Sequence, residues 1–169
     1  MLRAQQRFEE AIPEYETVLA INRNWVLAIA ALGYCKFITG SIDEAIPAQE
    51  QAIRLSPRDP RIWLFYYWTG QVHLLQSRID EAVPWFEKAR SANPEHPLPH
   101  VYLASACGLK GESSRAIAEL ARARELGGDD RYKSIARLRA VGPFGVPKIR
   151  ALFEATYFIG LRRAGMPDQ

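Results

Sequence analysis

Residues 29–47 read IAALGYCKFITGSIDEAIP, and residues 66–84 read YYWTGQVHLLQSRIDEAVP. Both stretches carry a glycine at the fifth position and an Ile-Asp-Glu-Ala run before a β-branched residue and a proline. The pattern returns as Glu9-Glu10-Ala11-Ile12 and, more weakly, as Ser114-Arg115-Ala116-Ile117. The alanines of the four copies are 34, 37 and 34 residues apart. The chain therefore contains an internal repeat.

Each repeat unit is typical of two helices joined by tight turns. Turn segments with glycine or a hydroxyl side chain precede the alanine helices, where an N-capping group belongs. Twelve residues after the alanine, three of the four copies have a helix breaker, namely Pro57, Pro94 or Gly128. Because a single helical hairpin cannot bury both of its faces, we expect the hairpins to stack on one another. The sequence predicts an all-α fold.

The unit resembles the tetratricopeptide repeat, which has a W-x2-L-G-x2-Y stretch in its first helix and then an alanine, an aromatic residue and a proline. The first-helix stretch is represented here by Leu32 and Gly33, and by Thr69 and Gly70 in the next copy. The aromatic position holds Tyr15 and Phe86, while Gln49 and Leu120 depart from the pattern. The resemblance implies a right-handed α-α superhelix of helical hairpins with C-terminal capping helices.

We divide the chain into an array over residues 1–128 and a helical extension over residues 129–169. The array has a partial first repeat at 1–25 and further repeats at about 26–59, 63–96 and 97–128. In register with the other copies, Met1 falls in the middle of a repeat. We expect the chain to be the downstream piece of a longer protein; the alternative is a small protein that begins with a truncated helix.

The extension reads as a short helix, a break and a final helix. The short helix is expected over 129–140, with Asp129-Asp130 at its start, where acidic groups favour the helix dipole. The break contains Gly142, Pro143 and Gly145, and Pro147 is placed to open a final helix to about Arg163. The wide apolar face of that last helix must be covered. It offers a surface for a homo-oligomer.

Residues 157–168, YFIGLRRAGMPD, resemble the ends of bacterial proteins that join an adenylate/guanylate cyclase domain or a winged-helix regulatory domain to repeats of this type. This resemblance implies a regulatory role in a larger signalling protein. The metal-binding aspartates of a cyclase would lie upstream, so no catalytic residue is carried over onto this chain.

Composition excludes several classes of protein. The longest run free of strongly polar residues spans 11 positions, from Trp25 to Cys35, against the ~20 that a membrane-spanning helix needs. Two cysteines, Cys35 and Cys107, give neither a disulfide framework nor a metal site. We therefore expect a cytoplasmic protein with no membrane segment.

No catalytic or cofactor-binding motif is present, so we predict that the chain is not an enzyme and needs no cofactor. His73 falls on a core position of its helix. His96 and His100 have ligand-like spacing, but Pro97 and Pro99 lie between them and no nearby cysteine or carboxylate set completes a metal site. A metal site is therefore not expected.

The family resemblance implies that the first helices of the repeats line a concave groove. Its positions in this chain are apolar, aromatic or uncharged, which favours an apolar protein or peptide partner over an acidic C-terminus. The alternative is that they pack against neighbouring helices or the C-terminal helix. We call this set the concave strip: Tyr34, Phe37, Leu64, Tyr67, Trp68, Gln71, Tyr102 and Ser105.

A second function class is binding of nucleic acid or an anionic surface through the tail. The net charge is +3, but residues 121–169 hold 10 Lys and Arg against 5 Asp and Glu. This excess of basic residues over 49 positions is modest, so a solvated basic face is favoured. Nucleic acid is the less favoured partner.

Overall fold

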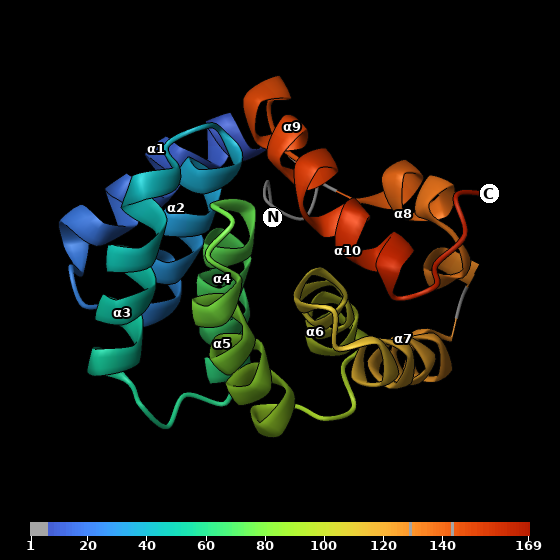
Figure 1. The fold of residues 1–169 in the computed structure, drawn as a ribbon. Helices are drawn as coiled ribbons and strands as arrows, with labels where there is room; N and C mark the ends of the chain where they lie inside the picture. The colour runs from blue at the N-terminus through green and yellow to red at the C-terminus, as the bar shows by residue number, and fades with distance from the viewer. Residues whose placement is uncertain (1–6, 129, 143) are drawn as a thin grey trace.

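The computed structural model describes residues 7–128, 130–142 and 144–169, and within these ranges it is built from helices and turns without a strand. Over the same ranges, seven α-helices form the array, and three more follow in the extension (Figure 1). The array helices are α1 (Phe8–Ile21), α2 (Val26–Ile38), α3 (Ala45–Leu55), α4 (Ile62–Leu75), α5 (Ile79–Ala92), α6 (Pro97–Lys110) and α7 (Ser113–Gly127), with the 3-10 helix η2 (Ile42–Glu44) before α3. The extension contains the 3-10 helix η3 (Asp130–Lys133), α8 (Ile135–Val141), α9 (Pro147–Ala155) and α10 (Tyr157–Arg163).

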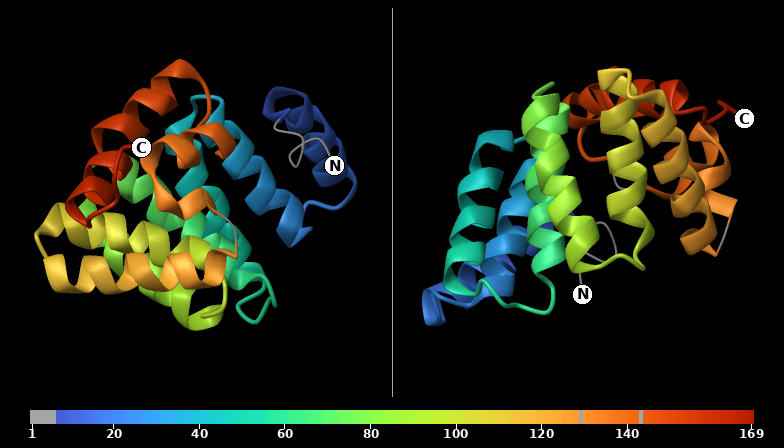
Figure 2. Two further views of the ribbon diagram at one scale, coloured as in Figure 1. Left: turned by 90° about the vertical axis from the view of Figure 1, so that its right-hand side faces the viewer. Right: turned by 60° about the horizontal axis from the view of Figure 1, so that its bottom comes forward.

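The hairpins stack side by side (Figure 2). They form the helical superhelix that the resemblance to the repeat family implies. Small residues let the two helices of a hairpin approach closely. A methyl group on Gly33 would lie 2.5 Å from the Ala48 Cβ, and one on Gly70 would meet the Phe86 ring at 2.7 Å. The repeated glycine is thus required by helix–helix distance. Residues 1–6 of the partial first repeat lie outside the described residues.

The extension folds back over the array instead of continuing the row of hairpins. Its connection reaches the far end of α2, where the Val146 amide donates to the Ile38 carbonyl at 3.0 Å. The chain then returns through α9 and α10, and α10 lies against α6 (Figure 1). The end of the chain closes on α8, because the Ile135 and Ala136 amides donate to the carbonyls of Pro167 and Asp168.

The final helix is not continuous, and the expectation of one helix from Pro147 to about Arg163 is wrong. It is broken at Thr156, whose φ of −128° and ψ of −74° are not helical. The Thr156 hydroxyl donates to the Leu152 carbonyl at 2.7 Å, and the Gly160 amide donates to the Thr156 carbonyl at 2.9 Å. This break redirects the chain so that α10 can lie along α6.

The short helix expected over 129–140 is also divided, here into η3 and α8. Ser134 separates the two, and its hydroxyl accepts from the Arg137 amide as an N-cap of α8. Asp129, expected at the helix start, and Pro143, expected in the following break, lie outside the described residues.

Candidate functional site

The concave strip lies in the interior of the molecule. Seven of its eight residues are buried, and Leu64 is partly buried. Its side chains come from α2, α4 and α6 of the array, and residues of η3, α8 and α10 of the extension face them. The strip is therefore the buried surface of the array that faces the extension, and we call it the wall.

Aromatic contacts join the repeats along the strip. The rings of Tyr34 and Trp68 stack with their centroids 4.9 Å apart, and Tyr67 meets Tyr102 edge-on at 5.0 Å. Tyr102 also stacks on Tyr157 of the extension at 4.3 Å. These separations suit the offset and edge-to-face pairs that aromatic rings prefer.

Polar contacts fix the extension on the same wall. The Ser105 hydroxyl donates to the Tyr157 carbonyl at 2.8 Å, and a methyl group on Gly160 would lie 2.2 Å from the Ser105 carbonyl oxygen. Among the apolar side chains of α9 and α10, Phe153, Phe158 and Leu161 are fully buried. Two residues of the strip, Tyr102 and Ser105, thus pack against the C-terminal helix.

A cavity of about 250 Å³ remains between the strip and the extension. Six of the eight strip residues line it; Phe37 and Ser105 do not. The extension contributes Tyr132, Leu138, Phe144 and Tyr157, among others. The sequence did not identify these four residues as part of the site. The one signal was the wide apolar face of the last helix, which carries Tyr157 and has to be covered.

The buried tyrosines of this wall remain protonated at neutral pH. Burial is the largest effect, and it raises the pKa of Tyr67, Tyr102 and Tyr157 above the usual value of a phenol. Neighbouring tyrosines raise the pKa of Tyr67 and Tyr157 further. The Gln71 amide nitrogen donates to the Tyr102 hydroxyl at 2.8 Å. The wall therefore presents neutral hydrogen-bonding groups on an aromatic surface.

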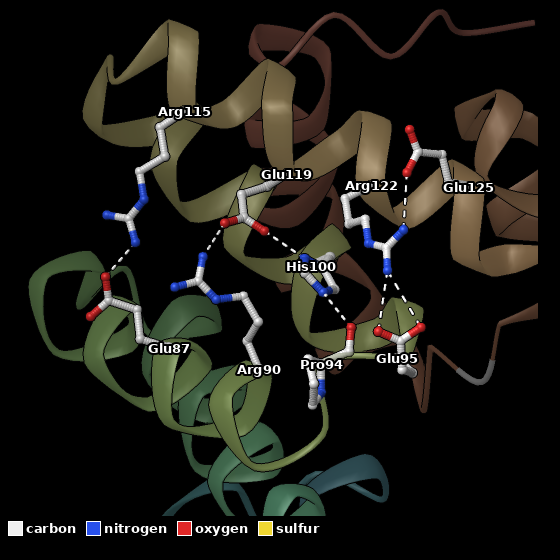
Figure 3. A network of polar contacts seen from close by, with 9 residues as sticks. All are labelled: Glu87, Arg90, Pro94, Glu95, His100, Arg115, Glu119, Arg122 and Glu125. Atoms are coloured by element: carbon white, nitrogen blue, oxygen red, sulfur yellow. Dashed lines mark hydrogen bonds and ion pairs between the residues drawn. The ribbon is translucent and has the colours of Figure 1, made fainter.

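A second polar cluster ties α5, α6 and α7 together (Figure 3). Glu119 pairs with Arg90 through one carboxylate oxygen and with His100 Nδ1 at 2.6 Å through the other. His100 Nε2 lies 3.0 Å from the Pro94 carbonyl oxygen. Both ring nitrogens therefore face oxygen atoms. This geometry connects three helices and gives the imidazole a structural role.

The two histidines with ligand-like spacing point to different neighbours. The His96 ring lies tilted against Trp63 with the centroids 4.3 Å apart, and its Nδ1 accepts from the Leu98 amide, whereas His100 faces Glu119. Among the described residues, no group of three or more His, Cys, Asp or Glu side chains could hold a metal ion. In the same part of the chain, no helix is both long and apolar enough to cross a bilayer.

Several cations of the tail are paired with acidic groups of the tail itself. Asp130 accepts from Lys133 and from Arg137, at 2.5 and 2.9 Å. Arg139 pairs with Glu154, and Arg162 pairs with Asp168. The positive charge available to a polyanion is smaller than the residue count suggests.

The chain matches a known family over more than half of its length. The family model described as tetratricopeptide repeat matches residues 2–60 and 39–97, which together cover more than half of the chain. The chain belongs to the tetratricopeptide repeat family. The "Cell division cycle protein 27 homolog" of Caenorhabditis elegans is 30% identical over 90 residues, which are 53% of this chain and 11% of that protein. The match thus spans about a tenth of that relative.

Solved tetratricopeptide structures share the fold. TTC0263 of Thermus thermophilus has a TM-score of 0.67 and 20% identity, over 97% of this chain and 87% of that one. MamA has a TM-score of 0.64 and 20% identity, over 97% and 92% of the two chains. YrrB has a TM-score of 0.60 and 16% identity, over 97% and 81%. Tetratricopeptide proteins are generally non-catalytic interaction scaffolds.

Proposed function

We propose that this tetratricopeptide protein is a non-catalytic protein-binding module whose concave strip accepts an apolar helix or extended segment. The observation that carries the proposal is the seating of Tyr157 on Tyr102, with the Tyr157 carbonyl bonded to Ser105. An apolar helix of the same chain already covers Tyr102 and Ser105 of the strip. A partner of similar chemistry would bind where α10 lies, in competition with it.

A peptide supplied in trans tests this proposal. The substitution Gly160→Leu places a large side chain against the Ser105 backbone and weakens the docking of α10. A fluorescent peptide of residues 144–165 should then bind to this variant and not to the original protein, as measured by anisotropy. The control is the same peptide with Tyr157 and Phe158 replaced by alanine, which should bind to neither.

Two results would contradict the proposal. One is a failure of the peptide to bind a Gly160→Leu protein that keeps its helical circular dichroism. The other is equal binding of the peptide and its alanine control, because that would show attachment without the aromatic contacts. If Gly160→Leu does not fold, Gly160→Ala is the milder variant for the same measurement.

We further propose that the module is the C-terminal regulatory part of a larger bacterial signalling protein in the cytoplasm. The resemblance of residues 157–168 to the tails of cyclase and winged-helix proteins supports this context. Two buried free cysteines fit a reducing compartment. Sequencing the gene upstream of Met1 tests it: a cyclase or DNA-binding domain in the same reading frame is expected, and a stop codon with a start site at Met1 would contradict it.

We also propose that the protein can self-associate through its C-terminal helix, in one specific way. Because the apolar face of α10 is packed on α6, a homo-oligomer built on this helix would form by exchange of extensions between chains. Light scattering over a hundredfold range of protein concentration tests it. A constant monomer mass would exclude this mode.

A further inference from the structure

The cavity between the strip and the extension has the size of a small molecule. Its volume of about 250 Å³ lies just below the ~300–1,000 Å³ that is usual for drug-sized ligands, and it is too small for a helix ~10 Å across. Its exposed lining residues are Arg131 and Val141, so it opens to solvent beside them. One or two fused rings would fill it.

Aromatic side chains dominate the walls. Tyr34 and Trp68 stack on each other on the array side, and Tyr102 stacks on Tyr157 where the extension meets the array. Ring faces and edges of this kind attract planar aromatic molecules more than aliphatic ones of equal volume. The cavity therefore favours a flat ligand.

One buried acceptor in the wall lacks a partner. The Gln71 side chain is only 2% exposed, and its nitrogen donates to Tyr102, but its Oε1 makes no hydrogen bond with any described residue. A buried carbonyl oxygen without a donor has lost its hydrogen bonds to water and has gained none from the protein. Most buried polar groups in native proteins have a hydrogen-bond partner. A ligand with an N–H or O–H group would supply the missing donor.

The charge of the lining narrows the ligand class further. Arg131 is the one charged side chain among the described residues that line the cavity, and no carboxylate is among them. The tyrosines Tyr67, Tyr102 and Tyr157 are uncharged at neutral pH because burial raises the pKa of their phenols. A cationic ligand would therefore meet no carboxylate in the described lining.

We propose that this cavity is a binding site for a neutral planar aromatic molecule of one or two rings that donates a hydrogen bond to Gln71. Such a ligand would touch both the strip and the extension. It would thus hold the two parts together and raise the melting temperature of the protein by linkage. The proposal does not depend on the binding of a peptide at the strip.

Indole and benzofuran form a matched pair of probes, because they have the same shape and only indole carries an N–H donor. Calorimetric titration of the full chain should show one site, with indole binding about three- to tenfold more tightly than benzofuran, as one net hydrogen bond provides. In Gln71→Leu, the two probes should bind equally, since the acceptor is gone and the cavity remains.

The location of the site is tested by filling its mouth. Val141→Trp places an indole ring at an exposed lining position and should abolish binding of both probes. Ile117→Trp, at an equally exposed position of α7 outside the cavity, is the matched control and should bind as the original protein does. Circular dichroism melts verify that each variant is folded.

Three outcomes would overturn the proposal. These are no binding of either probe at millimolar concentration, equal binding of indole and benzofuran to the original protein, and unchanged binding in Val141→Trp. The first would mean that water alone occupies the cavity. The second would mean that Gln71 is not the recognition group, and the third would place the probes elsewhere.

Discussion

Gly108 of α6 and Gly160 of α10 meet backbone to backbone. A methyl group on Gly108 would fall 2.2 Å from the Gly160 carbonyl oxygen, and one on Gly160 would fall 2.2 Å from the Ser105 carbonyl oxygen. Real Cβ atoms do not approach other atoms so closely. The extension can therefore lie against the array only while both positions lack a side chain.

Substitution of Gly108 by alanine should therefore loosen the extension. We expect the free energy of unfolding to fall by about 1–3 kcal/mol, because the new methyl group must push α10 away from α6. Urea unfolding followed by circular dichroism measures the change. Lys148→Ala, at an exposed position of α9, is the control and should change the free energy by less than about 0.5 kcal/mol. Equal effects of the two substitutions would show that the contact is not tight.

Glu119→Gln should destabilise the contact between α5, α6 and α7. The substitution removes the charge that Arg90 and His100 share, which we expect to cost about 1–3 kcal/mol at neutral pH. Glu125→Gln is the control, because Glu125 pairs with Arg122 on the exposed surface and should matter little. Comparable losses in the two variants would contradict the structural role of Glu119.

The same carboxylate gives a pH dependence of stability. Burial acts to raise the pKa of Glu119, but the hydrogen bond to His100 and the charge of Arg90 outweigh it and bring the pKa below the usual 4.5. A lowered pKa in the folded state contributes stability above pH 4.5 that is lost as the pH falls through the folded value. The stability difference between the original protein and Glu119→Gln should thus shrink as the solution is acidified. A difference that grows toward low pH would show the opposite sign.

The two cysteines should be unreactive in the folded protein. Both are buried, and burial raises the pKa of the Cys107 thiol to about 11, so little thiolate forms at about pH 8. A colorimetric disulfide reagent should detect neither thiol in buffer and both thiols in guanidinium chloride. Rapid native labelling of one equivalent would indicate that a cysteine is accessible.

Gln49 occupies the position at which the family pattern has an aromatic residue. Its amide nitrogen donates to the Ala30 carbonyl at 2.8 Å, while its Oε1 has no partner among the described residues. Gln49→Leu should leave stability unchanged or raise it by up to about 1 kcal/mol, because a poorly paired buried amide is removed at similar volume. Gln49→Ala should lower it by about 1–3 kcal/mol by leaving a cavity. Thermal melts compare the stability of the two variants. A greater loss of stability in Gln49→Leu than in Gln49→Ala would show that the hydrogen bond of Gln49 is essential.

Some features of the molecule could not be predicted from local patterns. The carboxylate of Glu119 lies within a helix whose periodicity gives no sign of its partners, His100 and Arg90, which are 19 and 29 residues away. The break at Thr156 was missed because nothing in its neighbourhood forbids a helix. The packing of residues 144–163 on the array could not be predicted for a similar reason. An apolar helix face indicates that it is buried, but it does not identify the surface that covers it.

The sequence by itself determined the helical hairpins, their stacking and the family, because each depends on neighbours a fixed number of residues apart. The spacing of Ala11, Ala45, Ala82 and Ala116 and the glycines opposite the second helices encode that contact directly. Only the tertiary structure decided what fills the concave side. That outcome depends on Gly108 and Ser105 of one helix meeting Gly160 of a distant one. The bonded pair Ser105 and Tyr157 is 52 residues apart, and no periodicity describes the shape of the two surfaces.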